Sequence, residues 1–347
     1  MSAVSADERP RLIAVRIGAG IWRVERRTVL FRCLLAVLVL LLGVAALTIG
    51  TFSLDLSQVV SVLGGGGEES VRKLVMDWRL PRVLFAVLGG AALGVSGAIF
   101  QSLTRNPLGS PDVIGFDAGS YTGALIVMLV VGSVSYSFIA AGAVLGGVAT
   151  ALVVYILAYR RGIQGFRFII VGIGVSAFLV GINGYLLISS GAQEARAAVA
   201  WGFGSFSALG WTQLVPFALV LAVILPLVAA ARRPFAQLEL GDDAAKALGV
   251  GVERTRLVVT VLGVALTAVV TAAAGPIAFV ALVAPQVARR LVRAPGLDLT
   301  SAGIMGALLL LASDFIGQRI DITVGLVTVV LGGGYFAWLL IREGLRR

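Results

Sequence analysis

The sequence predicts an all-α, polytopic membrane protein with about ten transmembrane helices. Of the 347 residues, 59% are hydrophobic and only 13% are charged, and the mean hydropathy is +1.00. A chain of this length cannot cover a water-solvated surface with so few polar residues. The apolar residues also gather in runs that are long enough to cross the roughly 30 Å hydrocarbon core of a bilayer.

Ten apolar runs are the candidate crossings, and they leave no room for a soluble domain between them. They cover residues 29–50, 83–103, 113–131, 136–158, 168–189, 211–231, 257–274, 275–291, 301–319 and 323–341. Residues 1–28 are expected to form a basic cytoplasmic tail, and residues 29–347 a single transmembrane domain. The first run is too long for the apolar core of a signal peptide and lacks a clear cleavage site, so we expect it to be retained.

The second run, from Val83 to Leu103, carries no charged residue. Its length corresponds to about 30 Å of α-helix, which is one bilayer crossing. A polar, proline-rich turn follows it, and we expect this turn on the cytoplasmic side. The turn contains Arg105, Asn106, Pro107 and Pro111.

Small residues recur at four-residue spacing in several of the runs. The series are Gly90 and Gly94; Gly115, Gly119 and Gly123; and Gly142 and Gly146. Such spacing lets helix backbones approach one another closely in lipid. It predicts a tightly packed bundle and indicates nothing about a substrate.

The apolar stretch 257–291 is too long for one crossing, because it would measure about 50 Å as a single helix. Gly275 and Pro276 are expected to break it. The second piece is short and is interrupted again at Pro285, which is typical of broken segments that line a transport pathway. A tight outer turn explains the same pattern, and Gln286 belongs to the segment under either interpretation.

The distribution of basic residues predicts the orientation. With a cytoplasmic N-terminus, 21 of the 28 Lys and Arg residues lie in inside segments and six in outside segments. The remaining one, Arg32, lies just within the first run. This excess on one side follows the positive-inside rule and predicts that both termini are cytoplasmic.

Several function classes are excluded by composition. The chain has no histidine and a single cysteine, so disulfides, iron–sulfur clusters and the usual zinc sites are not expected, and we predict no metal site and no resident cofactor. Neither Lys73 nor Lys246 follows a phosphate-binding glycine loop, so ATP hydrolysis would need another subunit. The scattered positive charge is also unlike a nucleic-acid-binding surface.

The cytoplasmic segment around Gly241 resembles a short capped helix. Asp242 follows Gly241, and Gly249 closes the segment. Aspartate is favourable in the first turn of a helix. Ala245 and Leu248 are three apart, so we expect them to share a face that docks into a cleft of another protein. An ordinary surface loop is the alternative.

Three charged residues near the outer ends of the runs are candidate site residues. Arg79 and Arg82 are three apart, so both guanidiniums could face outward toward a partner or an anionic substrate, although such arginines also serve as membrane anchors. Asp314 is a carboxylate within a crossing. We expect it to pair with Arg319 or to form a hydrogen bond with a neighbouring helix.

Four segments together resemble the permeases of iron-siderophore importers, the FecCD and BtuC-like family of ATP-binding-cassette (ABC) transporters. They are WRLPR, GAALGVSGAIFQSLTRNPLGSPDVIGFDAG, LELGDDAAKALGV and AGPIAFVALVAP. The resemblance covers the chain from about residue 50 to its C-terminus, and its wording is most similar to the ferric-enterobactin type.

The resemblance implies the ten-helix, type II importer fold in the inner or plasma membrane. It further implies a second, different permease chain, two ATPases that bind ATP and Mg, an extracytoplasmic binding protein and a ferric siderophore as substrate. The coupling helix would be residues 241–249, and Arg79, Arg82 and Arg319 would dock the binding protein. Gln286 stands where the family usually has histidine. Haem or cobalamin import remains an alternative, as does an ion-coupled secondary transporter.

Overall fold

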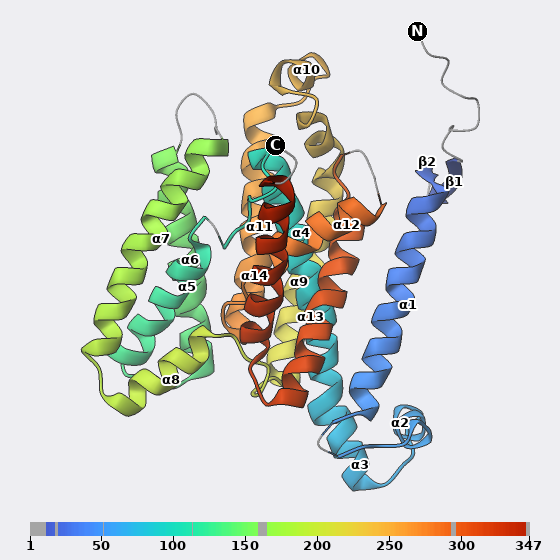
Figure 1. The fold of residues 1–347 in the computed structure, drawn as a ribbon, viewed down its shortest axis with the longest axis vertical. Coiled ribbons are helices and arrows are strands. Elements are labelled where there is room, and N and C mark those ends of the chain that lie inside the picture. Colours follow the sequence, from blue (N-terminus) through green and yellow to red (C-terminus); the bar gives the residue numbers. More distant parts are fainter. Residues whose placement is uncertain are drawn as a thin grey trace.

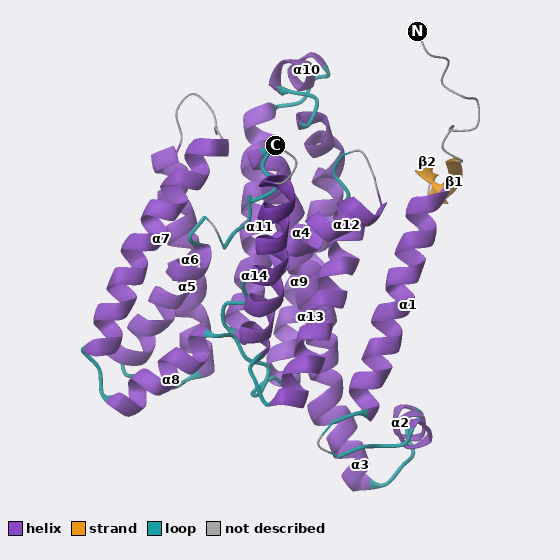
Figure 2. Cartoon of the chain, viewed as in Figure 1, coloured by secondary structure: helices purple, strands orange, loops and turns teal. Residues whose placement is uncertain are grey.

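The computed structural model describes residues 12–17, 20–50, 52–112, 114–158, 165–292 and 296–344. These residues are almost entirely helical, as predicted (Figure 2). The exception is an antiparallel hairpin of β1 (Leu12–Ile17) and β2 (Gly20–Glu25), which lies within the predicted tail. The rest of the tail before Leu12 lies outside the described residues.

The helices follow the predicted runs closely. Their bounds are α1 Arg26–Thr48, α2 Leu56–Leu63, α3 Glu69–Lys73, α4 Leu80–Thr104, α5 Phe116–Leu125, α6 Tyr136–Ala158, α7 Gly165–Ile188, α8 Ala192–Gly202, α9 Trp211–Leu238, α10 Asp242–Ala247, α11 Val252–Ala274, α12 Val280–Val292, α13 Leu299–Ile320 and α14 Val324–Gly344. Two π-helical segments, Leu74–Arg79 and Ile126–Val130, precede α4 and follow α5. Within the described residues, seven helices are long and apolar enough to cross a membrane.

One predicted crossing is wrong in its bounds. The run 275–291 is not a helix throughout, because α12 begins only at Val280 and has 13 residues. The predicted interruption at Pro285 is also absent, since α12 continues through it. Thirteen residues rise about 20 Å, so α12 by itself does not cover a bilayer core.

The outer connection 51–82 is largely helical. It contains α2 and α3, and α3 continues through the π-helical segment into α4, so that the helix is uninterrupted from Glu69 to Thr104. The side chain of Gln58 accepts the backbone N–H of Asp55 at 2.9 Å, which satisfies a donor at the start of α2.

The bundle has α4 at its centre, packed against α11, α12 and α13 (Figure 1). The helices α5, α6, α7 and α8 form a group to one side, and α6 of that group packs against α11. The loop at α10 and the β hairpin lie at one end of the molecule, and α2, α3 and α8 lie at the other.

Close backbone contacts explain the glycine series. A Cβ on Gly94 would lie 2.2 Å from the carbonyl oxygen of Ala302, and one on Gly123 would lie 2.0 Å from that of Gly142. The predicted close packing is therefore confirmed for α4 on α13 and for α5 on α6. Helix backbones in lipid gain dispersion and weak Cα–H···O contacts at such short separations.

Gly97 has the tightest of these contacts on α4. Its Cβ would lie 1.7 Å from the carbonyl oxygen of Ala281. That oxygen has no helical partner four residues on, because position 285 is a proline without an N–H. Proline on α12 and glycine on α4 therefore allow one close crossing of the two helices.

We expect Gly97→Val to reduce the stability of the protein by about 3 kcal/mol or more, because the added atoms meet backbone that cannot move aside. Fluorescence-detected size-exclusion chromatography after heating should show early loss of the folded peak. Gly334→Ala is the matched control, since nothing lies within 4 Å of its Cβ position. Equal heat resistance of the two variants would contradict this packing argument.

Candidate functional site

The segment predicted to couple to a partner is a short helix at the end of the molecule that also carries the β hairpin (Figure 1). Gly241 and Gly249 flank it with φ of +105° and +81°, a region that disfavours residues with a Cβ. Ala245 is 0% exposed and packs into the core, whereas Leu248 is 57% exposed. The prediction that they share a docking face is therefore wrong. Of these two residues, only Leu248 points outward.

An ion-pair cluster anchors α10 to the bundle. Asp242 accepts from Arg256 Nη2 at 3.0 and 3.1 Å, and Arg256 Nη1 also reaches Glu253 at 3.3 Å. The Arg256 side chain is only 9% exposed. One guanidinium nitrogen therefore contacts both oxygens of Asp242 while the other contacts Glu253, and these charge-assisted hydrogen bonds hold the start of α10 against α11.

The same carboxylate reaches the end of α4. Arg105 Nη2 lies 3.6 Å from Asp242 Oδ1 and donates to the carbonyl oxygen of Leu238 at 3.2 Å. Arg105 has φ +49° and ends α4 in the left-handed conformation. The predicted cytoplasmic turn therefore joins α4, the end of α9 and α10 through one arginine.

Glu239 gives a second connection that the sequence analysis missed. Its Oε1 accepts from the hydroxyl of Ser102 at 2.9 Å, and its Oε2 accepts the backbone N–H of Leu297 at 2.9 Å. Residue 239 directly follows α9, so these two bonds connect the α9–α10 junction with α4 and with the segment just before α13.

Gln286 holds the proline-rich turn against α12. Its Nε2 donates to the carbonyl oxygen of Pro107 at 3.0 Å and to Gln101 Oε1 at 2.8 Å. Gln101 Nε2 in turn donates to the carbonyl oxygen of Leu282 at 2.9 Å. The side chain of Asn106 accepts the N–H of Leu108 at 2.9 Å within the turn. Gln286 is therefore a connecting residue between the turn and α12.

The break after α11 lies where the sequence predicted it. Gly275 has φ +78°, and a Cβ there would lie 2.5 Å from the carbonyl oxygen of Trp201. Pro276 and Ala278 line a cavity of about 260 Å³ together with residues of α5, α7 and α14. The break therefore forms part of the wall of this cavity. Pro285 and Pro111 are buried outside that lining.

At the opposite end, Arg82 and Asp314 form an ion pair between α4 and α13. Arg82 Nη2 lies 2.7 Å from Oδ1, and Arg82 Nε lies 3.0 Å from both carboxylate oxygens. Asp314 is 0% exposed and also accepts from Gln318 Nε2 at 2.8 Å. The predicted hydrogen bond to a neighbouring helix is confirmed. The alternative partner, Arg319, is exposed and lies over the ring of Phe315 at 5.1 Å.

Arg79 does not share an outward face with Arg82. Its Nη1 donates to the carbonyl oxygen of Leu47 at 2.7 Å, and its Nη2 donates to that of Phe52. Both oxygens lie at or just beyond the C-terminal end of α1, where carbonyls lack helical partners. Through these two bonds Arg79 fixes the end of α1, in addition to any outward role.

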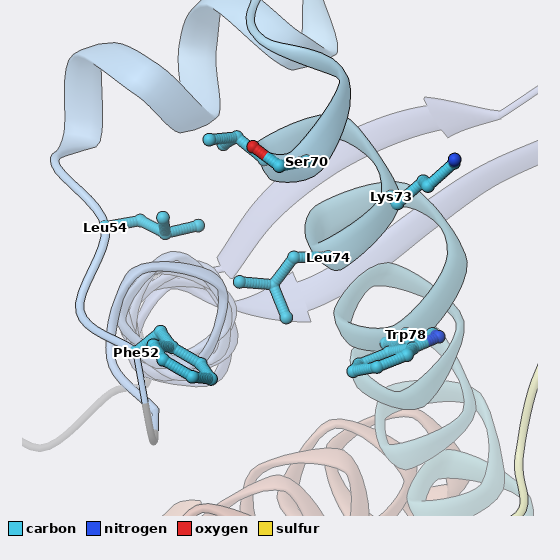
Figure 3. A pocket seen from close by; sticks show the side chains of 7 residues that line it. Phe52, Leu54, Ser70, Lys73, Leu74 and Trp78 are labelled. Carbon is cyan, nitrogen blue, oxygen red and sulfur yellow. The ribbon is translucent and has the colours of Figure 1, made fainter.

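Beside Arg79 is an apolar pocket of about 460 Å³ that the sequence analysis did not predict. Figure 3 shows Phe52, Leu54, Ser70, Lys73, Leu74 and Trp78 around it. These residues come from the loop after α1, from α3 and from the π-helical segment. The apolar residues Phe52, Leu54, Leu74 and Trp78 in the connection between the first two runs were the signal that could have indicated it.

The chain is similar to known transport proteins over most of its length. Residues 37–342 match the family described as the FecCD transport family. The chain is 47% identical, over 92% of its length and 98% of the relative's, to the ferric enterobactin transport system permease protein FepG of Escherichia coli (strain K12). It is 34% identical, over 82% of its length and 86% of the relative's, to the probable siderophore transport system permease protein YfhA of Bacillus subtilis (strain 168).

A solved structure gives the same result for the fold. It is described as an inward-facing conformation of a metal-chelate type ABC transporter. It is 26% identical in sequence, has a TM-score of 0.77, and the match covers 90% of this chain and 99% of that one. The chain is a multi-pass membrane protein and belongs to the FecCD transport family of ABC importer permeases.

Proposed function

We propose that this chain is the permease subunit through which an ABC importer moves a ferric siderophore into the cytoplasm, with an enterobactin-like catecholate as the first candidate. One observation carries the proposal. The ion pair between Asp242 and Arg256 fixes α10 to the bundle, while Leu248 at the end of α10 stays exposed. The names of FepG and YfhA supply the class of cargo.

The mechanism follows from the contacts at α10. Two separate ATPases would bind ATP and Mg and receive Leu248 in a surface cleft, since this chain has no phosphate-binding glycine loop. When the ATPases close, α10 moves. The contacts of Arg105 and Glu239 would carry that movement to α4, α9 and α13, and a second permease chain would complete the pathway.

The orientation belongs to the same proposal. The end that carries α10 would be cytoplasmic, and so would both termini, because the basic residues concentrate in the segments of that side. The end with α2, α3 and α8 would then face an extracytoplasmic binding protein. No metal or other cofactor is required in this chain for that role.

Cargo selection is tested by uptake of a panel of radiolabelled iron chelates in a strain that lacks this chain. We expect loss of catecholate uptake, and its return when the gene is supplied again. If only haem uptake or only cobalamin uptake is lost, that compound is the cargo and the siderophore assignment is wrong. Uptake that is unaffected for every chelate would contradict it.

Arg319 is the strongest remaining candidate for docking the binding protein, since Arg79 and Arg82 have partners within the chain. It is exposed at the outer end of α13. We expect Arg319→Glu to weaken association with the binding protein about fivefold, mainly through a slower on-rate that depends on salt. Biolayer interferometry at two salt concentrations measures this.

Arg196→Glu is the matched control, because Arg196 is an exposed arginine of α8 at the same end. Equal weakening by both variants would indicate a general charge effect. Unchanged association for Arg319→Glu would remove Arg319 from the docking surface.

A further inference from the structure

Two aspartates meet at the boundary between the α5–α8 group and the rest of the bundle. Asp112 lies in the connection between α4 and α5, and Asp117 lies in the first turn of α5. The connection folds back onto the start of α5, where the carbonyl oxygens of Pro111 and Asp112 accept the N–H groups of Phe116 and Gly115 at 3.2 and 3.1 Å, so the two aspartates lie on one tight turn. The function proposed above uses neither residue.

Each carboxylate has an oxygen with no partner. Asp112 Oδ2 accepts the backbone N–H of Phe279 at 3.0 Å, but Asp112 Oδ1 and Asp117 Oδ1 are buried and form no hydrogen bond with the described residues. Neither aspartate takes part in an ion pair within the described part of the chain. Burying an unpaired carboxylate is costly, and two that repel each other cost more.

Asp117 also lines the cavity of about 260 Å³ described above. Its polar neighbours there are already paired. Tyr121 donates its hydroxyl to the carbonyl oxygen of Ala198 at 3.2 Å, and Asn183 Oδ1 accepts from the hydroxyl of Thr122 at 2.7 Å. Among the described lining residues, Asp117 and Tyr121 are the titratable ones, and α7 and α14 contribute no charged residue.

We propose that Asp112 and Asp117 form a binding site for one monovalent cation, either a proton or an alkali metal ion, at this cavity. One positive charge leaves a single negative charge on the pair, which the N-terminus of α5 partly stabilises. The described residues contain no group of three or more acidic, histidine or cysteine side chains, which disfavours a multivalent metal. Burial also raises the pKa of Asp112 to about 6, although the N–H of Phe279 opposes that shift.

The position of the site gives the cation a structural effect. Asp112 belongs to the connection that begins at Arg105, and its carboxylate holds Phe279 at the break between α11 and α12. Asp117 starts the helix group on the other side. A bound cation therefore removes repulsion where the cytoplasmic connection, the α11–α12 break and the α5–α8 group meet. This inference does not depend on which chelate is carried.

Difference infrared spectroscopy tests the site without measuring transport. The intact transporter is purified from native membranes through a tag on this chain, placed in lipid nanodiscs, and titrated with pH and then with NaCl or KCl against choline chloride. Asp117→Asn is the primary variant, because Asp112 has the additional bond to Phe279. Asp112→Asn is the second variant. Asp321→Asn is the control, because Asp321 is exposed and its φ of +53° suits asparagine.

We expect the wild-type spectrum to contain a carboxyl signal that both aspartate variants of the pair lose and the control keeps. Conversion of the signal by pH alone identifies a proton. Conversion by Na⁺ or K⁺ at fixed pH, but not by choline, identifies an alkali metal ion. Spectra of the wild type and Asp117→Asn that coincide at every pH and in every salt would overturn the proposal.

Discussion

Replacing Arg82 with alanine should destabilise the protein by about 3 to 5 kcal/mol, because it leaves the carboxylate of Asp314 buried without its cation. Asp314 is 0% exposed and is held by Arg82 and Gln318. Asp314→Ala should reduce stability by a similar amount. The Arg82 side chain is mostly buried, with 23% of its surface exposed, and it would lose its carboxylate partner. Thermal unfolding of the purified protein in detergent and in lipid measures both effects.

The double replacement Arg82→Met with Asp314→Leu distinguishes an uncompensated charge from lost packing. We expect it to recover most of the stability that either alanine variant loses, because no unpaired charge remains and the volume is nearly kept. If the double replacement is as unstable as the sum of the two single ones, the pair does not act as a unit.

The second large effect is expected at α10. Leu248→Glu should reduce uptake about 100-fold or more, because in the proposed coupling role Leu248 inserts into the ATPase, and a charge buried there would remove the contact that transmits movement. ATP hydrolysis by the associated ATPase should continue but should no longer respond to the loaded binding protein. Uptake and phosphate release are measured on the same proteoliposomes.

Leu248→Met is the matched control, because it keeps an apolar side chain of similar volume at the same exposed position. It should retain uptake and the stimulation of ATP hydrolysis. Normal uptake by Leu248→Glu would remove α10 from the coupling role, whatever the control does.

Most of the crossings could be predicted from the sequence because hydrophobic runs of bilayer length have few alternatives in lipid, and seven of the described helices are long and apolar enough to cross. The run 136–158 coincides with α6. The run 275–291 was predicted incorrectly for a physical reason. Its first residues are as apolar as those of the membrane-spanning helices. Composition does not reveal that Phe279 has φ +68° and that α12 begins only at Val280.

The partners of the site residues could not be predicted from the sequence, because they lie on other helices. Asp242 was selected from its place after Gly241, but its partner Arg256 lies 14 residues away on another helix. Arg82 and Asp314 are 232 residues apart, so only the fold brings them together. Ala245 was assigned to an outward face from spacing alone, whereas the packing of α10 on the bundle buries it.

The central claim is that this chain transports by coupling to a separate ATPase. The most direct measurement is uptake of labelled ferric chelate into proteoliposomes that contain the intact transporter purified through this chain. The account predicts uptake that needs ATP and the binding protein and that stops when the ATPase is stripped away. Uptake by this chain alone, driven by a proton or sodium gradient without ATP, would contradict it.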